Sequence, residues 1–315
     1  MKTKSTENKE RKKSYVLLVV GLVLVIAGLL FVLWARQTSY QQSKNIGEEL
    51  SAVQKLLKAV EAGDVAGDAV SLKAQSTALS AEKLRLERPY SYGLTFFFLA
   101  IAILLKGVYN ALIGKVPSKA DVKRLALAGL MAALCYIGFA VFKFDITVGT
   151  EKTAFHLGNV FCVLAALLLG GFWGGLSGAI GMTIGDLTTT YVTSAPKTFL
   201  LKLLIGLIVG LVAHVIFKLS RPHTAKYVTG VTILACTLGM GFNVVADPLV
   251  GYFYKTYLLG VPQEIASVLA KWSAVTTFVN AVVAVILSSV FYLALRPALK
   301  KSGLFLQITP EKETV

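Results

Sequence analysis

The stretch GMTIGDLTTTYVTSAPKTFLLK, residues 181–202, joins two apolar segments through a short turn that is rich in threonine. It places Asp186, Lys197 and Lys202 within or beside segments that otherwise suit a lipid environment. A charged side chain inside a membrane is costly unless it is paired or hydrated, so it marks a structural ion pair or a functional site. The stretch therefore predicts membrane-spanning helices that bring polar groups together.

The composition of the whole chain agrees with a membrane protein. Of its 315 residues, 55% are hydrophobic and only 16% are charged, whereas soluble domains carry about 25% charged residues. The formal charge of +15 raises the question of nucleic acid. However, Lys and Arg are concentrated in short segments between apolar runs, as in the cytoplasmic loops of membrane proteins. We therefore expect an all-α polytopic protein that contacts the lipid bilayer and binds no nucleic acid.

The apolar runs predict eight membrane-spanning helices. One orientation satisfies the distribution of Lys and Arg in every loop, and it places both termini in the cytoplasm. Between the first two spans, residues 36–91 carry apolar residues at helical spacing and predict a helical hairpin outside the membrane. The expected spans are 15–35, 92–113, 123–143, 155–172, 173–191, 198–218, 227–254 and 264–295.

These spans divide the chain into four parts. We expect a basic cytoplasmic tail (1–14), followed by an anchor, outer hairpin and return span (15–114). A six-span substrate-binding domain (115–301) and a cytoplasmic tail (302–315) complete the chain. Within the six-span domain, the loop 143–155 is a candidate lid.

Polar residues of several predicted spans lie at a similar depth, toward the outer face. Asp186 lies about 13 residues into its predicted helix, so roughly 20 Å from the cytoplasmic end. Each polar residue alone is more often an interhelical hydrogen bond, but together they favour a polar chamber for a flat heteroaromatic ligand. The candidate substrate-binding residues are His156, Asn159, Asp186, Lys202, Asn243, Asp247, Lys271 and Trp272.

A simpler interpretation competes with this chamber. Asp186 and Lys202 can form a structural ion pair that holds two helices together. Lys197 is expected to extend toward the lipid headgroups, because its long apolar stem allows the ammonium group to reach water.

Motifs for catalysis, cofactors or metals are not found in the sequence. It holds no phosphate-binding loop, no HExxH and no GxSxG. Cys135, Cys162 and Cys236 each lie in an apolar run without a paired cysteine, which is typical of buried free thiols. We expect no enzyme, no cofactor and no metal site.

The run HLGNVFCVLAALLLGGFWGGLSGAIGMTIGDLTTTYVTSAPKTFLLKLLIGLIVGLVAH, residues 156–214, resembles the substrate-binding S components of energy-coupling factor (ECF) vitamin transporters. It is most similar to the group for riboflavin or for the pyrimidine precursor of thiamin. The resemblance covers about residues 120–300 and leaves residues 1–115 outside it.

The resemblance implies a six-helix bundle in a bacterial cell membrane, which binds a vitamin from outside in the outer half of the membrane. It also implies a partner, a transmembrane coupling subunit driven by two ATPases. The first helix of the bundle carries Ala128 and Ala132 at spacing four, and by resemblance these alanines dock on the coupling subunit.

Two other functions remain open at this stage. A stand-alone secondary carrier is one, although many carriers show paired internal repeats and none is apparent in these six spans. A membrane receptor with an outer helical input is the other, although residues 302–315 are too short for a signalling domain. Riboflavin, a thiamin-type pyrimidine and a pyridoxine-like molecule fit the expected chamber equally well.

Overall fold

The computed structural model describes residues 4–113, 122–148, 151–306 and 308. The chain forms two compact units. The first comprises Met1–Ser118 and Val192–Pro196, and the second comprises Lys119–Tyr191 and Lys197–Val315. Each unit is described below by itself.

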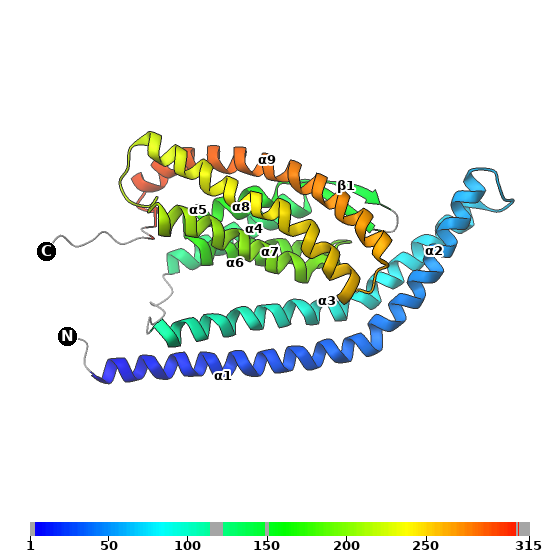
Figure 1. Cartoon of the computed structure of the whole chain (residues 1–315), viewed down its shortest axis with the longest axis horizontal. Coiled ribbons are helices and arrows are strands. Elements are labelled where there is room, and N and C mark those ends of the chain that lie inside the picture. Colours follow the sequence, from blue (N-terminus) through cyan, green and yellow to red (C-terminus); the bar gives the residue numbers. More distant parts are fainter. Residues whose placement is uncertain (1–3, 114–121, 149–150, 307, 309–315) are drawn as a thin grey trace. The chain divides into compact units, whose positions relative to one another are not determined.

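The first unit is a long antiparallel helical hairpin (Figure 1). Helix α1 (Lys4–Ala35) continues through a short π-helix, η1 (Arg36–Tyr40), into α2 (Gln41–Glu61). Helix α3 (Ala69–Ile113) returns along all three. The predicted anchor, outer hairpin and return span are therefore parts of two continuous helical runs.

The turn of this hairpin is built by Gly63 and Asp68. Gly63 has a φ of 80°, which glycine adopts without a steric penalty, and it ends α2. Asp68 begins α3, because its Oδ1 accepts a hydrogen bond from the backbone N–H of Val70 at 2.9 Å.

A seven-residue repeat forms the seam between the two helical runs. Gly21, Gly28 and Ala35 are seven residues apart and buried, and Ser43 and Leu50 continue the buried line. One extra residue separates Ala35 from Ser43, and η1 absorbs it because a π-helix has a wider turn than an α-helix. The repeat therefore keeps its phase from one end of the seam to the other.

The second unit is a bundle of six helical segments with a β-hairpin. It contains α4 (Val122–Ala140), strands β1 (Lys143–Val148) and β2 (Glu151–His156), α5 (Gly158–Leu169) and α6 (Gly171–Thr188). After η2 (Val192–Ser194), the chain continues as α7 (Ala195–Gly210) with η3 (Leu211–Ile216). It then forms α8 (Ala225–Phe253) with η4 (Tyr254–Leu258), and α9 (Gln263–Lys301).

The candidate lid is folded as this antiparallel β-hairpin, in which Lys143 pairs with His156. Alternating side chains such as those of Phe144, Asp145 and Ile146 suit a strand, because successive residues of a strand point to opposite faces. The hairpin adds two short strands to a fold that is otherwise helical.

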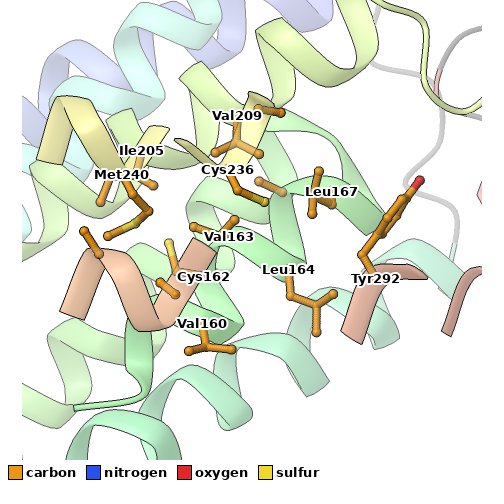
Figure 2. Packing of buried hydrophobic residues seen from close by; sticks show 14 of the residues in the cluster. Val160, Cys162, Val163, Leu164, Leu167, Ile205, Val209, Cys236, Met240 and Tyr292 are labelled. Carbon is orange, nitrogen blue, oxygen red and sulfur yellow. The ribbon is translucent and has the colours of Figure 1, made fainter. Parts of the chain in front are cut away.

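Helix α5 lies at the centre of the bundle, and nearly all of its residues are buried. A helix that is apolar on all sides is typical of such a central position. Figure 2 shows its side chains packed among those of α7, α8 and α9. The labelled residues are Val160, Cys162, Val163, Leu164, Leu167, Ile205, Val209, Cys236, Met240 and Tyr292.

Glycines allow the helices of this core to touch through their backbones. A Cβ atom at Gly174 would lie 2.3 Å from Cα of Ala166, and one at Gly206 would lie 2.1 Å from Cα of Gly175. Side chains are therefore excluded at these crossings, as is usual where helices pack closely in lipid.

Six helical runs of the described residues are long and apolar enough to cross a membrane. Two belong to the first unit and four belong to the bundle, namely α4, α7 with η3, α8 with η4, and α9. Helix α5 is shorter, and α6 is rich in glycine. The fold is thus that of an all-α polytopic membrane protein, while the count of eight spans stays a prediction.

Candidate binding site

Helices α6 and α7 carry a carboxylate and an ammonium group that are both buried. Asp186, near the end of α6, is 2% exposed, and Thr198 on α7 is its hydrogen-bond partner. Its second oxygen, Oδ2, has no partner. Lys202 on α7 is 6% exposed, and none of the ion pairs among the described residues includes it. The two groups interact electrostatically without the direct ion pair that the simpler interpretation expects.

The direct ion pair of the site joins Lys197 to Asp247. Nζ of Lys197 lies 2.8 Å from Oδ1 of Asp247. The other oxygen of Asp247 accepts hydrogen bonds from Ser273 and Thr277 on α9, the latter at 3.0 Å. Lys197 therefore does not extend to the headgroups as expected, because the partly buried carboxylate of Asp247 on α8 binds its ammonium group.

The β-hairpin is held on α9 by two side chains one turn apart. The amide of Asn280 accepts a hydrogen bond from the backbone N–H of His156 and donates one to the carbonyl of Ala154, both at 3.0 Å. The hydroxyls of Thr276 and Thr153 are 2.8 Å apart. Strand β2 thus covers the inward face of α9.

The other strand of the hairpin contacts the turn between α6 and α7. The phenol of Tyr191 donates a hydrogen bond of 2.8 Å to Asp145, and Lys143 forms an ion pair of 3.2 Å with the same carboxylate. Burial raises the pKa of Tyr191 above its usual range, and the bond to Asp145 raises it further. The phenol therefore stays protonated and keeps donating at physiological pH.

Several buried polar atoms near Asp186 and Lys202 have no hydrogen-bond partner among the residues that the structure describes. We call the residues that carry these atoms, together with Lys202, the polar cluster. An unpaired buried polar group costs about 1–3 kcal/mol, so native structures rarely gather several without a function. The unpaired atoms are His156 Nδ1, Asn159 Oδ1, Thr183 Oγ1, Asp186 Oδ2 and Asn243 Oδ1.

Contacts and electrostatic interactions place these residues near one another. Lys202 interacts electrostatically with both His156 and Asp186. The ring of His156 packs edge-on against Phe139, which also borders Gly158, the residue before Asn159. Asn243 lies one helical turn before Asp247, which interacts with Lys202 in turn.

The hydrogen-bonding capacity of the polar cluster is uneven. Three of its unpaired atoms are amide or carboxyl oxygens: those of Asn159 and Asn243 can only accept, and that of Asp186 accepts when the carboxyl is ionised. Lys202 can only donate. A molecule that fits this arrangement must offer several donors together with an acceptor for the ammonium group.

The structure brings most of the predicted site residues together, but not all. Asp247 is near, yet both of its oxygens already have partners. Lys271 and Trp272 lie on the exposed side of α9, and Trp272 is 44% exposed. The inward side of α9 instead carries residues at spacings of three and four, a helical signal that is present in the sequence: Ser273, Thr276, Thr277 and Asn280.

The alanines predicted to dock a partner are partly covered by the bundle itself. Ala128 is 7% exposed, and its carbonyl accepts a hydrogen bond of 2.9 Å from Ser177. The carbonyl of Ala132 packs against Gly181. The small residues that face outward on α4 are Ala126, Gly129 and Ala133, and the last two lie one position after Ala128 and Ala132.

No group of His, Cys, Asp or Glu side chains in the described part of the chain could hold a metal ion. Cys135, Cys162 and Cys236 are free and buried.

The fold is that of a multi-pass membrane protein, and the polar cluster is its candidate binding site. The family model of the ECF-type riboflavin transporter S component matches residues 119–297, and the chain belongs to this family. The chain is thus a substrate-binding subunit of a transporter, and its family is not one of enzymes. Neither the curated proteins nor the solved structures gave a match.

Proposed function

We propose that the chain captures a water-soluble vitamin from outside the cell and delivers it to an ECF-type importer. The observation that supports this proposal is the polar cluster: among the described residues, five of its buried atoms have no hydrogen-bond partner and Lys202 forms no direct ion pair. A bound ligand would satisfy these groups. The transmembrane coupling subunit and its two ATPases would then supply the energy for release into the cytoplasm.

Riboflavin is the vitamin that suits this cluster best. Its ring system presents an N–H between two carbonyl oxygens, and its side chain carries several hydroxyls. The ring edge can therefore donate to an oxygen such as Oδ2 of Asp186 while a carbonyl accepts from Lys202. The hydroxyls can serve the amide oxygens of Asn159 and Asn243. A thiamin-type pyrimidine or a pyridoxine-like molecule offers fewer donors.

Titration of the detergent-purified chain tests the proposal. Riboflavin fluorescence should be quenched on binding, and excess unlabelled pyridoxine or hydroxymethylpyrimidine should not restore it. Mass spectrometry of small molecules that copurify with the chain identifies the natural ligand independently. If none of the three vitamins binds and none copurifies, the proposal is wrong.

We also propose a bacterial cell membrane with both termini in the cytoplasm, from the distribution of Lys and Arg. Val70, at the tip of the first unit, is 79% exposed. Val70→Cys should react with an impermeant thiol reagent added to intact cells or spheroplasts. Ser302→Cys, exposed after the end of α9, is the matched control and should react only after the cells are opened. The reverse pattern would overturn the topology.

A further inference from the structure

The chain turns back on the bundle directly after α9. Gly303 has a φ of 67°, and the backbone N–H groups of Leu304 and Phe305 both donate to the carbonyl of Leu299 at 2.9 Å. This is the glycine-based ending that reverses a chain at the end of a helix. The ammonium group of Lys123, at the start of α4, donates to the carbonyl of Gly303.

The residues after this reversal, Leu304–Leu306 and Ile308, are called the strap below. Leu306 is 7% exposed and belongs to one apolar cluster with Ala128, Met131 and Ala165. Ile308 packs against the same cluster and against Gly170. Phe305 lies under two cationic side chains of α9, Arg296 at 5.5 Å and Lys300 at 5.4 Å. The strap thus connects the last helix of the bundle to the first.

The strap covers the flank of α4 next to its outward face. Ala128 and Met131 belong to the same apolar cluster as Leu306 of the strap. Gly129 and Ala133 face outward instead, and a Cβ atom at Gly129 would meet no atom within 4 Å. Without the strap, these four residues would form one continuous surface of small and apolar groups. Such a surface suits close helix packing in a membrane.

The strap also indicates what kind of segment this surface accepts. Its contacts with the apolar cluster are made by the aliphatic side chains of Leu306 and Ile308, whereas the cationic side chains of α9 lie over Phe305. An apolar segment of a partner would make the same contacts. The strap is short and carries no ion pair to the bundle among the described residues, so it can leave without unfolding the helices.

We propose that the strap is a displaceable cover over the docking surface for an apolar segment of the coupling subunit. This inference rests on the proposed function, because it assumes that a coupling subunit docks on α4. In the isolated chain the strap packs in one apolar cluster with Ala128, and the coupling subunit takes its place when the transporter assembles. Weakening the strap therefore favours assembly.

Whether the strap covers Ala128 is tested on the isolated chain, without the coupling subunit. Cys135, Cys162 and Cys236 are changed to Ala, Ala128→Cys is introduced, and thiol labelling is compared in the full chain and in a chain ending at Gly303. Because the strap packs in the same apolar cluster as Ala128, its removal should speed labelling by about tenfold or more. Riboflavin binding by both chains shows that they remain folded. Equal labelling rates would mean that the strap is not the cover.

Displacement is tested with the coupling subunit and its two ATPases, purified from the same organism. Leu306→Asp should tighten binding of this complex by about threefold or more, which is roughly 0.65 kcal/mol. Leu304→Asp introduces the same charge at a side chain that is 43% exposed and should leave binding unchanged. Unchanged or weaker binding by Leu306→Asp overturns the inference. If even the unaltered chain does not bind the complex, the proposed function fails, and the labelling result still decides the cover.

Discussion

Asp186, which is buried, and Asp247, which is partly buried, have the same chemistry but different surroundings. Asp247 receives an ammonium group and two hydroxyls, so its charge is fully compensated by Lys197, Ser273 and Thr277. Asp186 keeps one oxygen without a partner. The first arrangement is suited to holding helices together, and the second is suited to receiving a ligand. The sequence alone places both residues at a similar depth and does not separate these roles.

The groups without a direct ion-pair partner, Asp186 and Lys202, should determine the affinity for riboflavin. We expect Lys202→Met to weaken riboflavin binding by about tenfold or more, because one charge-assisted hydrogen bond contributes about 1.5–3 kcal/mol. Lys271→Met removes the same charge from the exposed side of α9 and should leave the dissociation constant unchanged. Fluorescence titration measures both. The double variant Asp186→Asn, Lys202→Met should fold, since it leaves no lone buried charge. Full affinity in that variant would remove both residues from the site.

The ion pair between Lys197 and Asp247 should determine the stability of the fold. Lys197→Met leaves Asp247 partly buried without its cation, and we expect a loss of about 3 kcal/mol in the free energy of unfolding. The double variant Lys197→Met, Asp247→Asn removes both charges and should recover most of this loss. Thermal unfolding in detergent measures both variants. If Lys197→Met were as stable as the unaltered chain, the ion pair would not be a structural lock.

At the scale of the element, the packing of the long hairpin of the first unit requires that the buried positions of its seam stay on one face of the helical run. The buried positions keep seven-residue spacing on each side of η1, and η1 accommodates one additional residue. Beside η1 and the start of α2, the rings of Tyr40 and Tyr90 stack with their centroids 4.4 Å apart. Deleting one residue from η1 and inserting one there are therefore expected to have opposite effects on the packing of the seam.

Deleting Gln37 should convert η1 into regular α-helix and preserve the seam. Inserting one alanine there should rotate Leu50 by about 100° away from α3. A disulfide between Leu50→Cys and Leu79→Cys, which lie in one apolar cluster, reports the register. It should form in the chain with normal η1 and in the deletion variant, and fail in the insertion variant. Equal cross-linking in all three would show that η1 does not set the register.

Hydropathy was sufficient to locate the helices but not to pair their side chains. The expected segments 123–143 and 227–254 correspond to α4 and to α8, because a span needs a long apolar run wherever it packs. Which lysine forms the ion pair with Asp247 depends on the rotation of α7 about its axis. Lys197 and Lys202 are five residues apart and so point about 140° apart on α7, and only one of them can approach Asp247 directly.

The strands and the α9 contacts were missed for related reasons. The loop 143–155 was assigned by its position between spans, although its alternating side chains indicate a strand. On α9, Lys271 and Trp272 were chosen by residue type, whereas the spacing of Ser273, Thr276 and Asn280 identifies the inward face. Periodicity therefore indicates which side of α9 faces into the bundle, whereas residue type alone does not.

At the scale of the whole molecule, transport requires both a ligand site and a surface for the coupling subunit. Ala133→Trp places a large ring on the outward face of α4, and we expect it to abolish uptake while riboflavin binding by the isolated chain is retained. Val282→Trp, on an exposed part of α9, is the control and should support uptake. Cellular uptake and fluorescence titration distinguish the two variants. Normal uptake by Ala133→Trp would place the docking surface elsewhere.

The contact between Gly175 and Gly206 has a consequence for selectivity. Because no side chain fits between α6 and α7 there, the two helices cannot slide past each other without breaking backbone contact. Asp186 lies on α6 and Lys202 lies on α7. The distance between their charged groups is therefore held nearly constant by the packing of the two helices. As a consequence of the proposed site, we expect the chain to bind a molecule whose hydrogen-bond donor and acceptor match the distance between Asp186 and Lys202, and to bind longer or shorter analogues of similar polarity more weakly.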